Sequence, residues 1–568
     1  MTLSRLTATL ASRLECATSS KYLIFPFFII LNLFTYADRG IIPGASREFS
    51  SFAANAQDTT EFIQNHPDAG IGLLQAGFIL GYSVAIVICG HLVHSVQWKK
   101  MTMIGFFLWL VAVFFSALSY SFDSFFVLFF ARTLSGVSEA SFQVIAPPMF
   151  QDRGGKHAGL WLSIFLSAMP LGMALGYVLG SLMANHSNYG WPWAYWIEGF
   201  LALPVLMIGF FIRDEKNGGV FTPKKEVIKT NQNDSSKATE STITSSNLTF
   251  MEEIKICLSS KPLLAIIAAQ SICIAVFAVL STFGGAFLLA LNLFESETQG
   301  ATLFGITAAI GGVIGTPLGG VLTDKVLSQH EKNINESNET PTEYEYHTSM
   351  RIKNLRELIT LLPVTTGIVS IGIAICYPTL FISNAYLFLG FLFFGWIFLF
   401  AAQSGITISV MLSVPDAQRS NAIAFTTLMV HVFGDVPSPI IFGLLKDEFA
   451  PACVVTADGL FLDEVQCRIQ HIGIRLTIGL AYVWITASVF FFEWARRLAM
   501  AELENLENGI ETGIMRQIKS TFRVPVSSLF PVKSMQLDKD HDNDNKNVFE
   551  YDSEEDDVID RSHYSGFL

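Results

Sequence analysis

Long apolar stretches separated by short polar segments dominate this chain. A helix that crosses a membrane needs roughly 17–25 mostly apolar residues, and we predict twelve such helices. They are centred near residues 30, 82, 110, 137, 170, 203, 275, 311, 366, 392, 432 and 484. The first stretch could pass for a signal peptide, because Lys21 precedes it and Thr-Tyr-Ala follows its apolar part. The later stretches, and Asp38 inside the first one, favour an uncleaved helix.

Two polar segments interrupt this pattern and suggest how the helices are grouped. Residues 214–260 contain NQNDSSKATESTITSSN, which is typical of a flexible linker. A second polar insertion spans residues 326–350. We therefore predict an all-α membrane protein with twelve transmembrane helices in two six-helix bundles. Its parts are a tail (1–20), a first bundle (21–213), the linker (214–260), a second bundle (261–496) and an acidic, largely disordered tail (497–568). This plan resembles the major facilitator fold, which is built from two parallel repeats.

The basic residues of the loops predict the orientation. Most loop Lys and Arg residues, including those of the linker, lie on one side of the membrane if the N-terminus is cytoplasmic. The opposite loops hold only Arg47, Lys446, Arg468 and Arg475. The positive-inside rule therefore predicts a multi-pass membrane protein with both termini in the cytoplasm.

One predicted outer loop contains two cysteines. Cys453 and Cys467 lie between the last two helices, on the side that would face the lumen or the outside. They could form a disulfide in an oxidising compartment. The alternative is two free thiols.

Composition excludes several classes of function. Hydrophobic residues make up 51% of the chain and charged residues 15%, against about 25% charged residues in a soluble domain. A soluble enzyme, a fibrous protein and a disordered regulator are therefore excluded. Much of the net charge of −13 lies in the acidic segment Asp538–Asp560, which would repel nucleic acid. The GxGxxG, Walker A and HExxH patterns are absent from the sequence, so we expect neither enzymatic activity nor a cofactor or metal.

Four charged residues fall within the first and fourth predicted helices, where charges are costly and usually mark a pathway or a pair. Arg132 and Glu139 are two turns apart, so both project from one face at a separation of roughly 10 Å. Asp38 and Arg39 are neighbours whose side chains diverge by roughly 100°, and we expect one of them to face the fourth helix. Competition between a proton and an anionic substrate there would give coupling through Asp38 and Glu139. The alternative is a fixed salt-bridge network.

The eleventh helix holds a second candidate site. His431 and Asp435 are four residues apart and therefore lie on one face. Pro437 and Pro439 interrupt the backbone hydrogen bonds beside them. We expect this segment to line a site or to bend during transport, and the alternative is a hydrogen bond that only stabilises the bend. Glu198 follows three Trp residues, so we interpret it as an anchor at the membrane interface.

The fifth helix carries small residues at four-residue spacing. Gly172, Gly176 and Gly180 would let a second helix approach closely. We expect this stripe to serve packing, and such a surface would also suit a helix pair that slides.

Five segments resemble the spinster group of the major facilitator superfamily. They are NLFTYADRG, RTLSGVSEASFQVIAPPMF, LSIFLSAMPLGMALGYVLG, GVIGTPLGGVLTDK and VPDAQRSNAIAFTTLMVHVFGDVPSP, within residues 22–213 and 262–447. Members of this group move lysophospholipids or sphingolipids, and some are proton-driven and lysosomal. The resemblance implies that Asp38 and Glu139 sense protons. It also implies that Arg39 and Arg132 partner these acids or bind a lipid phosphate.

The resemblance also implies a gating motif with one departure. Gly320, Asp324 and Lys325 keep the superfamily pattern in the eighth helix. After the second helix, where an Asp-Arg pair is usual, this chain has His94 and Ser95. We therefore expect the first half of the gate to be altered, and His94 could make it sensitive to pH.

Two other functions remain open. The protein could move a small organic anion or a sugar, or it could be a non-transporting sensor or scaffold that uses its tails. For its partners, we expect a membrane lipid as substrate, the surrounding bilayer and a monomeric state. Tyr564-Ser-Gly-Phe567 fits a tyrosine-based signal for a sorting adaptor. It favours a lysosomal or endosomal membrane over the plasma membrane.

Overall fold

The computed structural model describes most of the chain outside its tails and polar insertions. These residues are 21–65, 67–93, 95–186, 190–212, 249–294, 297–332, 343–453, 466, 469–510 and 512–514. Every regular element in these ranges is helical, and twelve helices are long and apolar enough to cross a membrane, as predicted. All of the described residues belong to one compact unit, residues 1–522.

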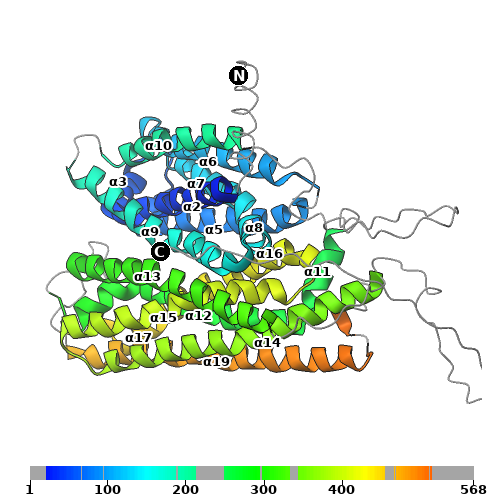
Figure 1. Ribbon diagram of the computed structural model, residues 1–568. Coiled ribbons are helices and arrows are strands. Elements are labelled where there is room, and N and C mark those ends of the chain that lie inside the picture. Colours follow the sequence, from blue (N-terminus) through cyan, green and yellow to red (C-terminus); the bar gives the residue numbers. More distant parts are fainter. Residues whose placement is uncertain are drawn as a thin grey trace, which may run out of the picture. The chain divides into compact units, whose positions relative to one another are not determined.

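The first six spans form one group of helices, drawn in blue to cyan in Figure 1. They are α2 (Lys21–Gly44), α5 (Pro67–Leu92), α6 (Trp98–Ser121), α7 (Phe125–Gln143) with α8 (Ala146–Arg153), α9 (Ala158–His186) and α10 (Pro192–Phe211). A short 3₁₀ turn, Gly155–His157, precedes α9. Two short helices that the sequence did not predict, α3 (Ser46–Asn55) and α4 (Glu61–Asn65), connect the first two spans. Helix α2 packs along α9, and α5 packs along α7.

The last six spans form the second group, drawn in green to orange (Figure 1). They are α12 (Lys261–Ala290), α13 (Glu297–Lys332), α14 (Glu343–Cys376), α15 (Ala385–Leu412), the composite eleventh span and α19 (His471–Glu507). The eleventh span consists of α16 (Arg419–Val430), a π-helix (His431–Asp435) and α17 (Pro437–Phe449). Short 3₁₀ turns lie at Tyr377–Leu380, Asp416–Gln418 and Pro451–Cys453. Helices α9 and α13 pack against each other across the two groups.

Several helices extend beyond the predicted boundaries. Helix α11 (Phe250–Ser259) lies inside the predicted linker, and Thr249 and Glu252 form a capping box at its start. Helices α13 and α14 both continue into the predicted insertion, and α19 continues past residue 496 to Glu507. These prediction errors share a cause, because hydropathy reports the membrane-embedded part of a helix and not its polar continuation.

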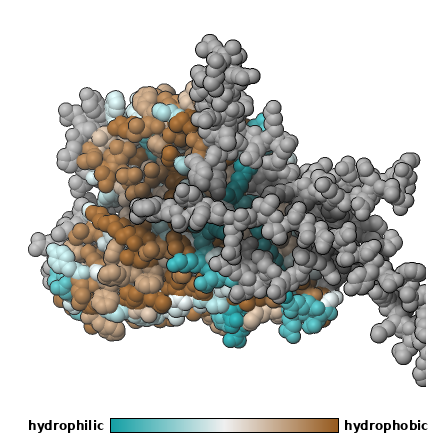
Figure 2. Space-filling model, in the orientation of Figure 1, coloured by the Kyte–Doolittle hydropathy of each residue, from teal (hydrophilic) through white to brown (hydrophobic). Residues whose placement is uncertain are grey.

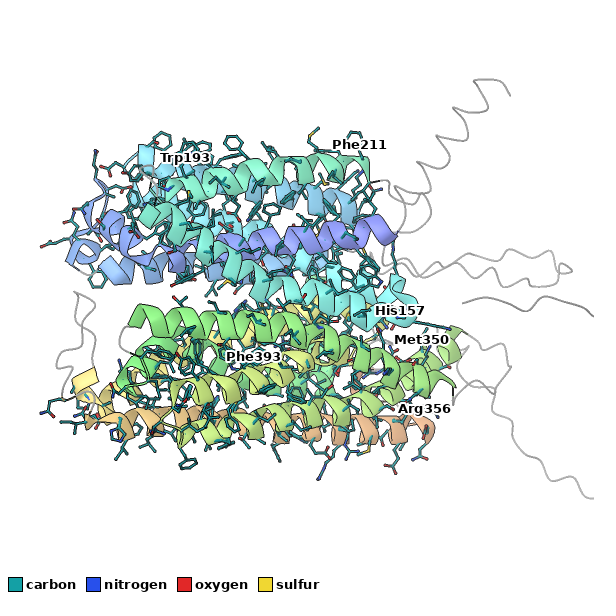
Figure 3. The ribbon with its side chains drawn as sticks, turned by 60° about the vertical axis from the view of Figure 1, so that its left-hand side comes forward. His157, Trp193, Phe211, Met350, Arg356 and Phe393 are labelled. Carbon is teal, nitrogen blue, oxygen red and sulfur yellow. The ribbon has the colours of Figure 1, made fainter. Side chains whose placement is uncertain are left out.

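Ion pairs hold two of these polar continuations together. Arg351 and Arg356 on α14 each lie 2.9 Å from a carboxylate oxygen on α19, of Glu502 and Glu507 respectively. Figure 3 labels Met350 and Arg356 of α14 and His157 before α9 at one end of the helices. We name this end the linker end, because α11 also packs there against α16.

The outward surface of the helices is apolar. Hydrophobic side chains cover much of both groups in Figure 2. On α10, Trp193 and Phe211 mark the two ends of the helix in Figure 3 and are both exposed. Large exposed hydrophobic residues in this quantity are unusual for a soluble monomer. They fit a surface that faces lipid.

The predicted glycine stripe is a close helix–helix contact. A Cβ atom at Gly176 of α9 would overlap the carbonyl oxygen of Ala37 on α2, and Gly172 and Gly180 approach the α2 backbone in the same way. The second group repeats this arrangement, because a Cβ at Gly319 of α13 would overlap the α15 backbone. Glycine at these positions lets paired helices touch backbone to backbone. This packing places α2 directly against α9. It thereby sets the position of Asp38 and Arg39 along the helix axis.

Candidate functional site: crossed ion pairs between α2 and α7

Asp38 on α2 pairs with Arg132 on α7. The Nη1 atom of Arg132 donates to Asp38 Oδ1 at 2.6 Å, and Ser135 Oγ donates to Asp38 Oδ2 at 2.7 Å. The two charged side chains are almost completely buried, with 1% of Asp38 and 4% of Arg132 exposed. Each oxygen of the Asp38 carboxylate therefore has a donor, as a buried charge requires.

Arg39, the next residue of α2, pairs with Glu139 on the same helix α7. Its Nη2 and Nε atoms donate to the two oxygens of Glu139 at 2.7 and 3.2 Å, a bidentate arrangement. We expected one of the two neighbours to face α7, and in the structure both of them pair with it. Asp38 and Arg39 leave α2 in different directions, but the Arg39 side chain is long enough to reach Glu139 on α7. The two pairs are thus crossed, with one acid and one arginine on each helix.

Aromatic rings surround the Arg39 guanidinium. Its central carbon lies 4.6 Å from the ring centroid of Tyr36, 4.4 Å from that of Phe78 and 5.4 Å from that of Tyr82. Cation–π attraction of this kind stabilises a guanidinium that has lost part of its water shell. The Arg39 side chain remains 21% exposed, in contrast to its partner Glu139 at 1%. Arg39 is therefore the more accessible member of this pair.

Two amide side chains extend the network from α7 to α9. Gln143 donates through Nε2 to Glu139 at 3.1 Å and to Asn32 Oδ1 at 2.8 Å. Asn32 in turn donates to the carbonyl oxygen of Phe165 on α9 at 2.8 Å. These residues were not predicted from the sequence. Their spacing was a usable signal, because Gln143 lies four residues after Glu139 and Ser135 three after Arg132, on the same helix face.

His431 and Asp435 form the predicted pair in the eleventh span. His431 Nδ1 lies 2.8 Å from Asp435 Oδ2, and the two residues bound the π-helix. The His431 ring meets the Tyr82 ring edge to face, with centroids 5.5 Å apart. Because Tyr82 also lies beside Arg39, the pair in the second group and the ion pairs in the first group border one another. A π-bulge at such a place is typical of a functional segment.

Glu198 on α10, which the sequence suggested as an anchor at the membrane interface, is buried among the helices. Only 2% of it is exposed, so its side chain does not face headgroups or water as an anchor would. It interacts electrostatically with Asp38 and Arg132, and both of its carboxylate oxygens are buried without a hydrogen-bond partner among the described residues. The neighbouring Trp residues misled the prediction, because they occupy the start of α10 while Glu198 lies on its inward face.

Asp324 joins the two groups at the linker end. Its two carboxylate oxygens accept the backbone N–H groups of Gly159 and Leu160 at 2.7 and 2.9 Å. These groups belong to the first turn of α9. An acid at that position accepts hydrogen bonds from backbone N–H groups that have no partner within the helix, and its negative charge interacts favourably with the helix dipole. Gly320 lies one turn before Asp324, where a Cβ would overlap Ser163 of α9. Lys325 is exposed.

The remaining contacts at the linker end also cross between the groups. Arg419 at the start of α16 lies 2.6 Å from Asp152 of α8. Ser420 donates through Oγ to the carbonyl oxygen of Val144 at 2.9 Å. These contacts close the linker end in the described conformation. His94 lies outside the described residues, so its expected effect on the gate stays a prediction.

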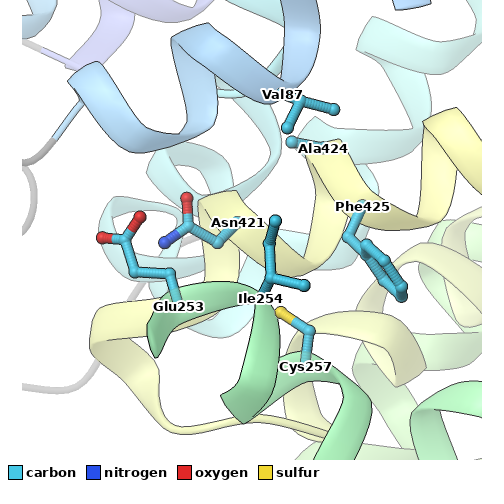
Figure 4. Close-up of a pocket in the computed structure, with 7 residues that line it drawn as sticks. All are labelled: Val87, Glu253, Ile254, Cys257, Asn421, Ala424 and Phe425. Carbon is cyan, nitrogen blue, oxygen red and sulfur yellow. The ribbon is translucent and has the colours of Figure 1, made fainter. Parts of the chain in front are cut away.

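A contact that the sequence did not predict lies beside this gate. His91 Nδ1 at the end of α5 lies 2.6 Å from Glu253 Oε2 on α11, and Asn421 of α16 also hydrogen-bonds to Glu253. Figure 4 shows Glu253 and Asn421 lining a small pocket with Cys257. Burial raises the pKa of the Glu253 carboxyl above its usual value, and the bonds from His91 and Asn421 partly offset that rise. Helix α11 thus bridges both groups of helices.

Two predictions fall on positions that the structure does not describe. Cys467 and the Cys453 side chain lie outside the described residues, so the disulfide stays a prediction. The same holds for the Tyr564–Phe567 sorting signal.

Comparison with known families identifies the class of this protein. The family model described as Major Facilitator Superfamily matches residues 27–439, and the chain belongs to that superfamily. A solved structure of a bacterial homolog to the human lysosomal transporter Spinster, inward-facing and unoccupied, matches with a TM-score of 0.52 at 14% identity. The match covers 85% of this chain and 99% of that one. It supports the same twelve-helix fold.

The similar curated proteins narrow the group within the superfamily. A probable sphingolipid transporter, spinster homolog 1 of Arabidopsis thaliana, is 26% identical, and the match covers 76% of this chain and 85% of the relative. Protein spinster homolog 1 of Homo sapiens is 25% identical, with 89% and 88% covered. The predicted resemblance to the spinster group is therefore confirmed. The protein is a major facilitator transporter of the spinster type.

Proposed function

We propose that this protein is a proton-coupled secondary transporter that moves a lysophospholipid or a sphingolipid by alternating access. The observation that carries the proposal is the crossed arrangement of two acids and two arginines between α2 and α7. Charged groups buried in a membrane protein are costly, and they persist where they bind an ion, a proton or a substrate. The names of the Arabidopsis relatives, which are given as probable sphingolipid transporters, support the choice of a lipid cargo.

Arg39 is the residue that we expect to meet the anionic headgroup. It is the more exposed member of its pair, and the rings of Tyr36, Phe78 and Tyr82 lie around it. A phosphate that pairs with Arg39 would compete with Glu139 for the same guanidinium. Glu139, once deprived of its partner in a buried site, would bind a proton instead. This exchange couples one proton to one anionic headgroup, and the only bond that forms is the O–H bond of Glu139.

Alternating access requires the linker end to open. In the described conformation two contacts link the two groups of helices. Asp324 accepts hydrogen bonds from the backbone of α9, and Arg419 forms an ion pair with Asp152. If the basic loops are cytoplasmic, this conformation is closed toward the cytoplasm. Opening would break these charged contacts and would separate α9 from α13.

The test is uptake of labelled lysophosphatidylcholine and sphingosine 1-phosphate into proteoliposomes, with and without a pH gradient. We expect the gradient to stimulate uptake by the native chain and by Glu507→Gln, whose exposed pair lies away from the site. Glu139→Gln should lose that stimulation, because an amide cannot exchange a proton. Absence of uptake of either lipid by folded native protein would overturn the lipid cargo. Stimulation that persists in Glu139→Gln would overturn the role of that acid.

A further inference from the structure

Glu198 differs from the two acids of the crossed ion pairs in how it is bound. The oxygens of Asp38 accept from Arg132 and Ser135, and those of Glu139 accept from Arg39 and Gln143. Both oxygens of Glu198 are equally buried, yet they have no hydrogen-bond partner within the described part of the chain. An ionised carboxylate in that position would be strongly disfavoured. The neutral, protonated form avoids the cost of a buried charge and keeps only the smaller cost of an unpaired polar group.

The surroundings of Glu198 reinforce this difference. Helices α2, α6 and α9 pack against α10. Among the described residues, the charged groups that act on Glu198 are Asp38 from α2 and Arg132 from α7, and Tyr195 of α10 interacts with the same groups. Arg132 is already paired with Asp38 at 2.6 Å. A second negative charge on Glu198 would therefore be repelled by Asp38 without having an arginine of its own.

The charges of the buried network balance only if one proton is present. Asp38, Glu139 and Glu198 are three acids, and Arg39 and Arg132 are two permanent cations, since an arginine stays charged in proteins. With all three acids ionised, the network would carry one uncompensated negative charge. Because Asp38 and Glu139 hold the two arginines, the acid that carries the proton is the one without a cation.

We infer that Glu198 is a proton-binding site of this transporter, protonated in the described conformation and deprotonated when Arg132 separates from Asp38. The inference rests on the proposed proton coupling and adds a second proton site, the Glu198 carboxyl, to the exchange proposed at Glu139. When Arg132 turns from Asp38 to Glu198 on the open side, the O–H bond of Glu198 breaks and its proton passes to the water that has entered there. The same water solvates the ionised Asp38 that Arg132 has left, so no uncompensated charge stays buried. Arg132 then pairs with the new Glu198 carboxylate, and the proton returns when Arg132 moves back. No oxidant or further reactant is needed.

The direct test is infrared spectroscopy of the full-length protein in lipid nanodiscs. A protonated carboxyl group has a C=O stretching band that is distinct from that of a carboxylate and shifts on exchange into D₂O. We expect the native protein to show such a band at neutral pH, Glu198→Gln to lose it, and Glu61→Gln, an exposed control, to keep it. Identical carboxyl bands in the native protein and Glu198→Gln would overturn the inference.

Transport by the same variant tests whether the proton is used. We expect Glu198→Gln to retain exchange of substrate between two equal pools, because Gln resembles the neutral acid in shape and charge. Accumulation driven by a pH gradient should fall to the level without a gradient, whereas Glu61→Gln should accumulate substrate like the native protein. Gradient-driven accumulation equal to that of the native chain in Glu198→Gln would overturn the inference.

These two experiments separate this inference from the proposed function. If native protein shows no gradient-driven uptake, proton coupling fails as a function, and the infrared band still reports whether Glu198 holds a proton. If native uptake is gradient-driven and Glu198→Gln matches it, the coupling stands and only the assignment to Glu198 fails. Should Glu198→Gln not fold, Glu198→Asp keeps a carboxyl group, and we expect a displaced infrared band. An unchanged band would then count against the inference.

Discussion

Removing Arg132 should destabilise the protein far more than removing an arginine that makes the same contact at the surface. Arg132 lies 2.6 Å from Asp38, and both side chains are buried. Arg356 lies 2.9 Å from Glu507, with 42% and 46% of the two side chains exposed. Arg132→Gln and Arg356→Gln therefore make the same chemical change at similar distances, and the two sites differ mainly in burial.

The expected magnitudes follow from that difference. Breaking a buried ion pair by removing one partner costs about 3–5 kcal/mol, because the remaining charge stays buried without compensation. Asp38 would keep Ser135 as a donor, which places the cost toward the lower end of that range. An exposed pair contributes about 0–1 kcal/mol. If the first group of helices unfolds cooperatively, the loss of about 3 kcal/mol lowers the unfolding temperature by roughly 6 °C or more.

The assay is thermal unfolding of both variants in detergent, followed by the fraction of monodisperse protein after heating. Asp38→Asn combined with Arg132→Gln should recover part of the loss, because no buried charge then lacks a partner. Equal shifts for Arg132→Gln and Arg356→Gln would refute the reasoning from burial. The same conclusion would apply if the double variant were as unstable as the sum of the two single ones.

Three further predictions concern the helix contacts. Gly176→Ala places a methyl group on the α2 backbone and should cost about 1–3 kcal/mol. Gly367→Ala, which faces open space within α14, should leave the unfolding temperature unchanged or raise it, because alanine favours a helix over glycine. A fall of the same size in both variants would contradict the packing. Asp324→Asn should weaken the capping of α9 by about 1 kcal/mol. The backbone amides at the start of α9 should then exchange about fivefold faster. Unchanged exchange would contradict the closed gate. Because burial raises the pKa of Glu253, the contact of α11 is strongest below the ordinary glutamate pKa of about 4.3 and weakens as pH rises through the raised value. The hydrogen-exchange rate of the α11 backbone amides, corrected for its intrinsic dependence on pH, should therefore increase as pH rises over that window. In Glu253→Gln the corrected rate should not depend on pH. An equal dependence on pH in the variant would contradict this linkage.

The number and order of the membrane helices could be predicted because hydropathy acts on segments of about twenty residues. Each predicted span has a counterpart in the structure. The glycine stripe at Gly172, Gly176 and Gly180 was equally predictable, because small residues four positions apart form one surface of a single helix. The bounds of α11, α14 and α19 were not predictable in this way. Tertiary contacts outside the membrane, such as the pair between Arg351 and Glu502, stabilise those ends.

The candidate site was predicted in its residue types and only partly in its geometry. Charged residues within apolar stretches identified Asp38, Arg39, Arg132 and Glu139, but the crossed pairing depends on how α2 and α7 face each other across space. Glu198 shows more clearly what the sequence could not predict. The neighbouring Trp residues suggested that it lies at the membrane interface, whereas its side chain is buried among the helices. Whether a residue near a helix start faces lipid or the bundle interior depends on which other helices cover it, and that information is not local.

The two halves of the molecule differ in how they carry charge, and this difference suggests how they share the work of transport. The first half concentrates its acids and arginines between α2, α7 and α10, as two buried ion pairs and the buried Glu198 carboxyl. The second half faces this network with His431 on a π-helix just before Pro437, a segment whose backbone hydrogen bonds are already irregular. Tyr82 touches both sites, lying beside Arg39 and against His431. A change of charge in the first half can therefore act, through the Tyr82 ring, on a segment of the second half whose backbone hydrogen bonds are irregular.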